Sequence, residues 1–163
     1  MRDWVLALKH GGRLDLARPL AELLAMRVRQ ADVELDLDLD LAVVCSVPLH
    51  PARRFVRGYD QAGLLARFVA LELGLICLRV LQRTRATPPQ GAAGAVSRSA
   101  NVRGAFRARE DALPWLLGRS VLLVDDVVTS GATADECARC LRRAGASSVI
   151  VVCLARAIPR RPE

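Results

Sequence analysis

The stretch that decides the fold is Val121-Leu122-Leu123-Val124-Asp125-Asp126-Val127-Val128-Thr129-Ser130-Gly131-Ala132-Thr133. Its apolar beginning predicts a buried strand over 120–124, with two acidic residues at the carboxyl end of that strand. A short polar loop then leads into a helix predicted over 132–144, which Gly145 ends. In open α/β sheets, ligands bind at the carboxyl ends of the strands. The stretch therefore predicts a ligand site in an α/β domain.

The two halves of this stretch suit two parts of one ligand. The carboxylates of Asp125 and Asp126 repel phosphate but accept hydrogen bonds from sugar hydroxyl groups. The loop offers hydroxyl groups, a glycine that allows close backbone approach, and the N–H groups of a helix N-terminus, which together bind a phosphate monoester. We predict a phosphorylated ribose as the ligand. The expected contacts come from Asp125, Asp126, Val127, Thr129, Ser130, Gly131, Ala132 and Thr133.

Two other interpretations of the stretch explain less of it. Paired acids after a strand also hold magnesium in ATPases, but these need a G-x-x-x-x-G-K-[ST] loop, and Lys9 is the sole lysine and lies in no such motif. An ordinary turn from strand to helix accounts for one hydroxyl group as an N-cap. It leaves the two acids and the remaining hydroxyl groups unexplained.

Predicted strands and helices alternate along the rest of the chain. They are a helix from Ala17 or Arg18 to about 30, a strand over 41–47, a helix over 59–73, strands over 77–81 and 149–154, and a short strand at Phe106. The acids between 32 and 40 alternate with apolar residues, which predicts an extended segment with one acidic face. Residues 83–103 read as a long loop. This order predicts an α/β fold, a mainly parallel sheet flanked by helices, in a single domain 1–163 with a loose tail near 158–163.

Composition and charge narrow the class of protein. The hydrophobic content of 52% favours a packed globular domain over disorder. No apolar run is long enough for a membrane span, and the first residues do not form a signal peptide, so we expect a cytoplasmic protein. The net charge of +7 comes almost entirely from arginine, which suits polyphosphate ligands or nucleic acid.

The five cysteines are expected to be reduced thiols, because their number is odd and no secretion signal is recognised. Cys137 and Cys140 form a C-x-x-C motif, but no second pair or nearby histidine completes a zinc site. Both residues fall within a helical pattern. We therefore predict structural cysteines and no zinc site.

Several segments, in order along the chain, share the pattern of one known family. They are Val47-Pro48-Leu49-His50-Pro51 with Arg53 and Arg54, then Arg57-Gly58-Tyr59-Asp60-Gln61-Ala62, then Gln90, Arg98, Asn101, Ala105 and Phe106 at their spacing, and finally 121–133. In these segments the chain resembles the ComF family of competence-associated, type I phosphoribosyltransferase-like proteins. No cysteine precedes Cys45 in this sequence, so we expect no N-terminal zinc module of the kind that many family members carry. Asp60 stands where the family usually has asparagine, and Ala93-Gly94-Ala95 thins the region of its lid.

The resemblance implies a ligand and a set of residue roles. The ligand is 5-phosphoribosyl-1-pyrophosphate (PRPP) or ribose 5-phosphate, with Mg²⁺ held through the ligand and through Asp125 and Asp126. The implied catalytic residues are Asp125, Asp126 and Arg57, with Gln61 facing the same cleft. Pyrophosphate is expected on the turn with Leu49, His50, Arg53 and Arg54. The lid is expected to carry Gln90, Arg98 and Asn101.

Two functions follow from the resemblance. One is transfer of the phosphoribosyl group to an acceptor with release of pyrophosphate. The alternative is a non-catalytic accessory protein of competence and DNA uptake that binds single-stranded DNA and protein partners. The charge of +7 favours the DNA backbone, whereas an aromatic content of 4% leaves few side chains for base stacking. An oligomer is compatible with either function.

Overall fold

The main sheet consists of four parallel strands in the order β2-β1-β5-β6. The structure is a computed structural model, which describes residues 2–10, 12–35, 39–49, 59–85 and 102–156. The strands of the sheet are β1 (Ala42–Ser46), β2 (Ile76–Cys77), β5 (Ser120–Val128) and β6 (Ser148–Arg156). A separate antiparallel hairpin pairs β3 (Leu81–Arg83) with β4 (Phe106–Ala108). The prediction of a mainly parallel sheet is confirmed.

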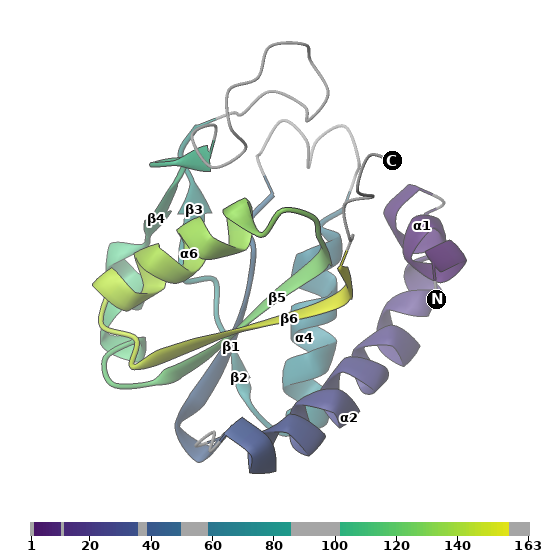
Figure 1. Cartoon of the computed structure of the whole chain (residues 1–163), viewed down its shortest axis with the longest axis horizontal. Helices are drawn as coiled ribbons and strands as arrows, with labels where there is room; N and C mark the ends of the chain where they lie inside the picture. Colours follow the sequence, from purple (N-terminus) through teal and green to yellow (C-terminus); the bar gives the residue numbers. More distant parts are fainter. Residues whose placement is uncertain (1, 11, 36–38, 50–58, 86–101, 157–163) are drawn as a thin grey trace, which may run out of the picture.

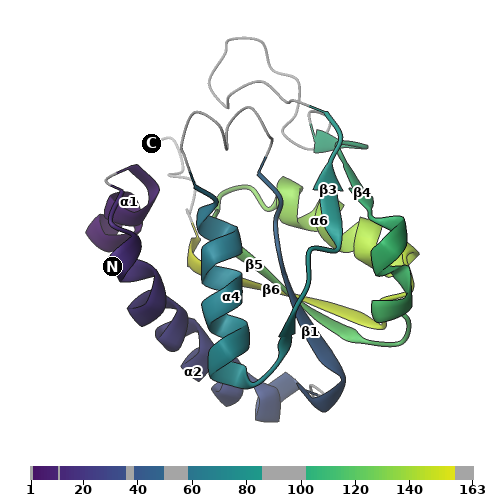
Figure 2. The same ribbon diagram turned by 180° about the vertical axis from the view of Figure 1, so that it is seen from behind.

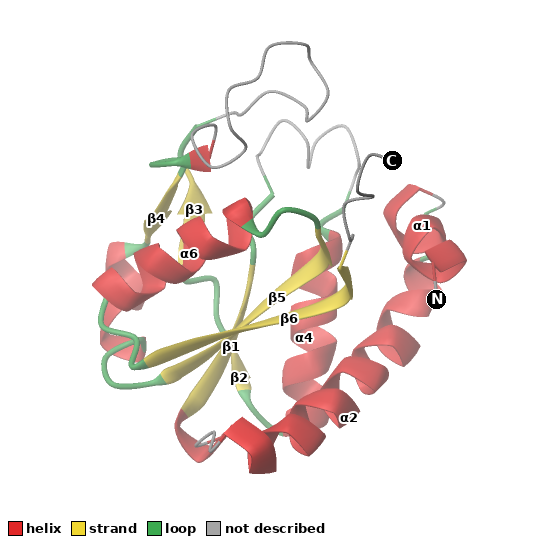
Figure 3. Ribbon diagram, in the orientation of Figure 1, coloured by secondary structure: helices red, strands yellow, loops and turns green. Residues whose placement is uncertain are grey.

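Helices cover both faces of this sheet (Figure 1). The α-helices are α1 (Arg2–His10), α2 (Ala17–Leu35), α4 (Gln61–Leu73) and α6 (Ala132–Arg143). Three short 3₁₀ turns, η1 (Leu14–Leu16), η2 (Leu39–Leu41) and η3 (Glu110–Trp115), complete the described elements. Helices α2 and α4 lie on one face and α6 on the other, as the views from the front (Figure 3) and from behind (Figure 2) show. The arrangement is that of an α/β fold with three layers.

The core has two halves because successive side chains of a strand point to opposite faces of the sheet. In β5, Val121 and Leu123 pack toward α6 and the hairpin, whereas Leu122 and Val124 pack toward α2 and α4. All four side chains are fully buried. A strand buried on both faces reads as a continuous apolar run, which is why 121–124 could be recognised in the sequence.

Strand β5 is longer than predicted. The expected end at Val124 is wrong, because the ladder with β6 continues from Asp125 opposite Cys153 to Val128 opposite Arg156. β6 offers backbone partners along this whole length, and these hydrogen bonds outweigh the local preference of acidic residues for loops. Both acids therefore lie within a strand rather than in the loop after it.

Two other predictions of extended structure are wrong. The strand expected over 77–81 is two strands, β2 and β3, in different sheets. Next to β2, the Leu78 N–H donates to the Val44 carbonyl oxygen of β1 at 2.8 Å. Next to β3, the Val80 carbonyl oxygen accepts a hydrogen bond from the Arg109 N–H, just after β4, at 2.9 Å. Residues 32–35 belong to α2, because an established helix adds one hydrogen bond for each further residue. The expected tail at 158–163 lies outside the described residues. Among the described helices, none has the length and apolar character needed to cross a membrane.

The two-sided core predicts a large effect for the central strand. We expect Leu122→Ala to lower the free energy of unfolding by about 2–5 kcal/mol, because the lost methyl groups leave a cavity between the sheet and α4. Leu117→Ala is the matched control, since the Leu117 side chain is 75% exposed. Urea unfolding followed by circular dichroism measures both, and equal stability of the two variants would contradict the assignment of the core.

Candidate functional site

A pocket of about 150 Å³ opens at the carboxyl ends of β1 and β5. Its lining comes from the loop after β1, the start of α4, the end of β3, the end of β5 and the first turn of α6. The lining residues are Val47, Pro48, Leu49, Asp60, Gln61, Ala62, Arg83, Asp125, Asp126, Val127 and Thr133. Segments far apart in the sequence therefore meet at one edge of the sheet, where α/β proteins bind their ligands.

The register of β1 and β5 sets the position of the two acids. Ser46 lies opposite Val124, and the Val47 N–H donates to the Val124 carbonyl oxygen at 2.9 Å. The loop after β1 consequently runs beside Asp125 and Asp126. The chain itself orients both carboxylates, because the Asp126 N–H donates to Asp125 Oδ1 (2.9 Å) and the Val127 N–H donates to Asp126 Oδ1 (2.7 Å).

The polar loop after β5 ends in a helix N-terminus. Gly131 caps α6 with a φ of 84°, a left-handed conformation that glycine adopts without strain. Thr133, in the first turn of α6, lines the pocket together with Asp125, Asp126 and Val127. The other predicted contacts, Thr129, Ser130, Gly131 and Ala132, lie between these residues in sequence but are not part of its lining. The structure thus brings together about half of the predicted contact set.

The start of α4 forms another wall of the pocket. Asp60 is the N-cap of this helix, and its Oδ1 accepts a hydrogen bond from the Gly63 N–H at 3.0 Å. A Cβ atom at Gly63 would lie 2.8 Å from Asp60 Oδ2, so a larger residue there would displace the capping carboxylate. Gln61 is buried and lines the pocket, as the resemblance implied. The aspartate that departs from the family pattern therefore has a local role as a helix cap.

The structure describes only one residue of the expected pyrophosphate turn and none of the expected lid residues. Leu49 of the expected pyrophosphate turn lines it. The rest of the expected pyrophosphate turn, the expected lid residues and Arg57 lie outside the described part of the chain. They are His50, Arg53, Arg54, Arg57, Gln90, Arg98 and Asn101.

Arg83 lines the pocket and was not predicted to do so. It ends β3, and its guanidinium carbon lies 5.2 Å from the centroid of the Phe106 ring, which is its cross-strand partner. Sequence reasoning treated 83–103 as one loop. The signal that could have identified Arg83 is its position two residues after apolar Leu81, because an extended segment places both of these side chains on the same face.

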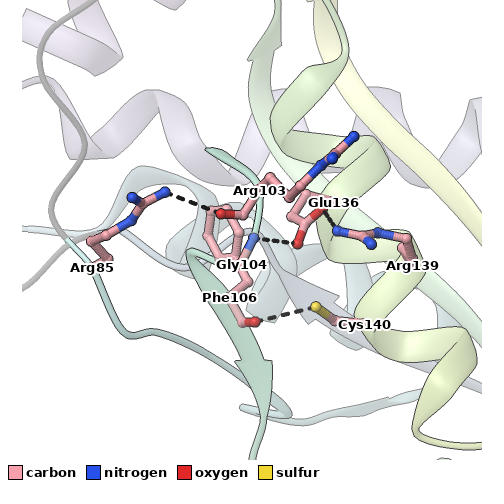
Figure 4. A network of polar contacts seen from close by, with 7 residues as sticks. All are labelled: Arg85, Arg103, Gly104, Phe106, Glu136, Arg139 and Cys140. Carbon is pink, nitrogen blue, oxygen red and sulfur yellow. Dashed lines mark hydrogen bonds and ion pairs between the residues drawn. The ribbon is translucent and has the colours of Figure 1, made fainter. Parts of the chain in front are cut away.

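A polar network joins the hairpin to α6 (Figure 4). Glu136 of α6 accepts a hydrogen bond at Oε1 from the Gly104 N–H (2.8 Å) and forms an ion pair with Arg139. Burial by itself raises the pKa of the Glu136 carboxyl, but the hydrogen bonds from Arg139 and Gly104 outweigh it and hold the pKa below its ordinary value. The network therefore fixes the segment that leads into β4 against the helix that carries Thr133.

The C-x-x-C motif lies beside this network. Burial raises the pKa of the Cys137 thiol, which packs in the core, and the Cys140 thiol donates to the Phe106 carbonyl oxygen at 3.3 Å. Both thiols thus serve the contact between α6 and β4. Within the described ranges, no group of three or more His, Cys, Asp or Glu side chains could hold a metal ion.

The pKa of Glu136 leads to a prediction about stability and pH. We expect Glu136→Gln to lower the free energy of unfolding by about 1 kcal/mol at pH 7, since Arg139 is partly exposed and its ion pair is screened. Because the pKa of Glu136 is lower in the folded state, its ionised carboxylate stabilises the fold fully at pH values above the ordinary glutamate pKa of about 4.3. The difference should therefore disappear as the pH falls through the lower pKa of Glu136.

Urea unfolding of the unsubstituted chain and of Glu136→Gln, at pH 7 and at a series of lower pH values, tests this expectation. Glu110→Gln is the control, because Glu110 is an exposed residue of η3. A loss of stability that does not shrink anywhere in this acid series would show that the Glu136 charge is not responsible.

Comparisons with known proteins identify the family and the fold of this chain. Residues 59–163 match the phosphoribosyl transferase domain family. The DNA utilization protein YhgH of Escherichia coli (strain K12) is 39% identical over 154 residues, which cover 93% of this chain and 65% of that protein. Competence protein F of Haemophilus influenzae is 36% identical over 143 residues, which cover 86% of this chain and 61% of that protein. The chain thus spans slightly less than two thirds of the length of these relatives.

A solved structure shares the fold at low sequence identity. The allosteric regulatory enzyme of purine biosynthesis superposes with a TM-score of 0.58 at 22% identity, over 92% of this chain and 30% of the other. At this identity the similarity concerns the fold alone. Together the comparisons confirm the type I phosphoribosyltransferase-like fold and the resemblance to the ComF family that the sequence predicted.

Proposed function

We propose that this chain, which belongs to the phosphoribosyl transferase domain family, binds PRPP or ribose 5-phosphate at the carboxyl ends of β1 and β5. One observation carries the proposal. A single pocket is lined by the loop after β1, by Asp125 and Asp126, and by the first turn of α6. A sugar hydroxyl site and a phosphate site in one pocket suit a phosphorylated ribose.

Each part of the ligand has a proposed partner in this pocket. The carboxylates of Asp125 and Asp126 accept hydrogen bonds from the ribose hydroxyl groups. The 5-phosphate binds the loop 129–133, where hydroxyl groups and the N–H groups of the α6 N-terminus supply donors. The pyrophosphate extends toward the turn that follows β1, with Leu49, His50, Arg53 and Arg54 as its contacts. Arg57, Gln90, Arg98 and Asn101 complete the proposed set.

The proposed reaction is a substitution at the anomeric carbon of the ribose. The bond from this carbon to the pyrophosphate oxygen breaks, and the oxygen leaves with the electron pair. A bond to the nucleophilic atom of the acceptor forms in its place. Asp125 and Asp126 act by positioning the sugar, and nearby guanidinium groups stabilise the charge that develops on the leaving group.

Magnesium fits the proposed site as an ion shared with the ligand. Asp125 and Asp126 provide carboxylate oxygen atoms, which Mg²⁺ prefers, but two side chains leave most of its octahedral positions to ligand oxygen atoms and water. When bound, the ion would neutralise charge on the departing pyrophosphate. Binding of PRPP should therefore depend on magnesium more strongly than binding of ribose 5-phosphate.

The paired acids give the direct test. We expect calorimetric titration with PRPP and Mg²⁺ to show binding that the double variant Asp125→Asn with Asp126→Asn weakens by at least about a hundredfold, because charge-assisted hydrogen bonds to the sugar are lost. Asp111→Asn is the control, since this exposed residue pairs with Arg109 and does not line the pocket. Unchanged affinity in the double variant would exclude the proposed site.

Binding of single-stranded DNA is the second candidate function. It is supported by a shallow, open surface on α6, formed by Arg139, Arg142 and Arg143 together with Asp135 and Ala138. Arginine side chains on one helical surface attract a phosphate backbone without reading its bases. The relatives are named a DNA utilization protein and a competence protein, which agrees with this candidate.

The salt dependence of binding tests whether the arginines of α6, rather than the overall positive charge of the chain, bind the DNA. We expect Arg142→Gln with Arg143→Gln to weaken binding of a single-stranded oligonucleotide and to make the slope of log K against log salt shallower by about 1.4, for two lost phosphate contacts. Arg27→Gln with Arg29→Gln removes the same charge from α2 and should leave the slope almost unchanged. Equal effects of the two pairs, measured by fluorescence anisotropy, would rule out the α6 surface as the DNA-binding site.

A further inference from the structure

Arg83 is the one cationic side chain among the described residues that line the pocket. The other charged side chains of this lining are carboxylates, those of Asp60, Asp125 and Asp126. Three carboxylates repel an anionic ligand, so a guanidinium group at their side changes which ligands the pocket accepts. Arginine also matches phosphate geometry, because its planar fork donates two parallel hydrogen bonds.

We infer that Arg83 is a ligand-binding residue that makes the pocket select a ribose carrying a second phosphorylated group, such as the pyrophosphate of PRPP, over ribose 5-phosphate alone. This inference rests on the proposed function. The helix N-terminus and the hydroxyl groups near Thr133 provide for one phosphate. Arg83 lies on a different element, β3, and is the proposed contact of a second phosphate group.

The guanidinium of Arg83 is held in place by the hairpin. Arg83 and Phe106 are cross-strand partners, and the guanidinium lies over the Phe106 ring at 5.2 Å from its centroid. Phe106 is itself buried, with 4% of its surface exposed. A cation stacked on a buried ring loses little further freedom when it binds phosphate, which favours affinity.

The hairpin in turn is fastened to α6, the helix that begins at the proposed 5-phosphate site. The Cys140 thiol donates to the Phe106 carbonyl (3.3 Å), and Glu136 accepts from the Gly104 N–H (2.8 Å), so α6 contacts β4 at one position within the strand and at another just before it (Figure 4). The two positive regions of the site, Arg83 and the N-terminus of α6, are thereby kept at a set separation. A fixed separation selects for ligands whose phosphates are spaced to match.

Arg85 offers a matched comparison on the same hairpin. It lies two residues after Arg83, its side chain is exposed, and its guanidinium donates to the Arg103 carbonyl oxygen at 3.0 Å. It does not line the pocket. Substitution of Arg85 therefore removes the same charge from the same segment without removing a pocket contact.

The test is calorimetric titration of the unsubstituted chain and of Arg83→Gln, Arg83→Lys and Arg85→Gln with PRPP and with ribose 5-phosphate, both in Mg²⁺. We expect Arg83→Gln to weaken PRPP binding by about ten- to a hundredfold, the effect of losing a hydrogen bond to a charged group. Ribose 5-phosphate should bind within about twofold of the unsubstituted chain. Arg83→Lys should restore part of the PRPP affinity, and Arg85→Gln should bind both ligands normally.

Each other result contradicts the inference in a recognisable way. Equal weakening of both ligands by Arg83→Gln, together with a lower melting temperature, would mean that Arg83 only supports the fold. Unchanged PRPP affinity in Arg83→Gln, while the unsubstituted chain binds PRPP, would overturn the inference and leave the proposed function standing. An unsubstituted chain that binds neither ligand would overturn the proposed function, and the inference with it.

Discussion

The pairing of β1 with β5 is the constraint on which the rest of the structure depends. Five successive residue pairs, from Ala42 with Ser120 to Ser46 with Val124, align the two strands. A slip by one residue would turn every β5 side chain to the other face of the sheet and exchange the two halves of the core. It would also move the loop after β1 away from the acids. The same register therefore determines the packing of the molecule and the composition of its pocket.

Local sequence pattern was enough for the elements whose stability is local or whose burial is complete. α4 and α6 show helical periodicity, and Asp125 with Asp126 could be placed at the carboxyl end of the central strands. The end of β5 was missed because it depends on pairing with β6, where Asp125 lies opposite Cys153. Arg83 was missed for a similar reason, since its three-residue strand β3 is stabilised by pairing with β4, which lies more than twenty residues further along the chain.

The hairpin illustrates how one helix serves several parts of the molecule. Leu81 and Phe106 of the hairpin pack in the same apolar cluster as Cys137 and Leu141 of α6, and burial of this surface provides most of the stabilisation. The hydrogen bonds of Glu136 and Cys140 fix the orientation of the hairpin relative to α6 and contribute less to stability. Helix α6 thus contributes the proposed phosphate site at its start, a support for the hairpin in its middle and arginine side chains on its exposed side.

The parallel sheet also governs how the chain reaches this structure. Ser46 and its partner Val124 are 78 positions apart in the sequence (124 − 46), and each pairing within the sheet joins distant segments. Contacts of such long range require closure of large loops before they stabilise anything, which slows folding. During synthesis, β1 leaves the ribosome well before its central partner exists. Nascent chains consequently expose an apolar strand for an extended interval, and their yield in a cell depends on what shields it.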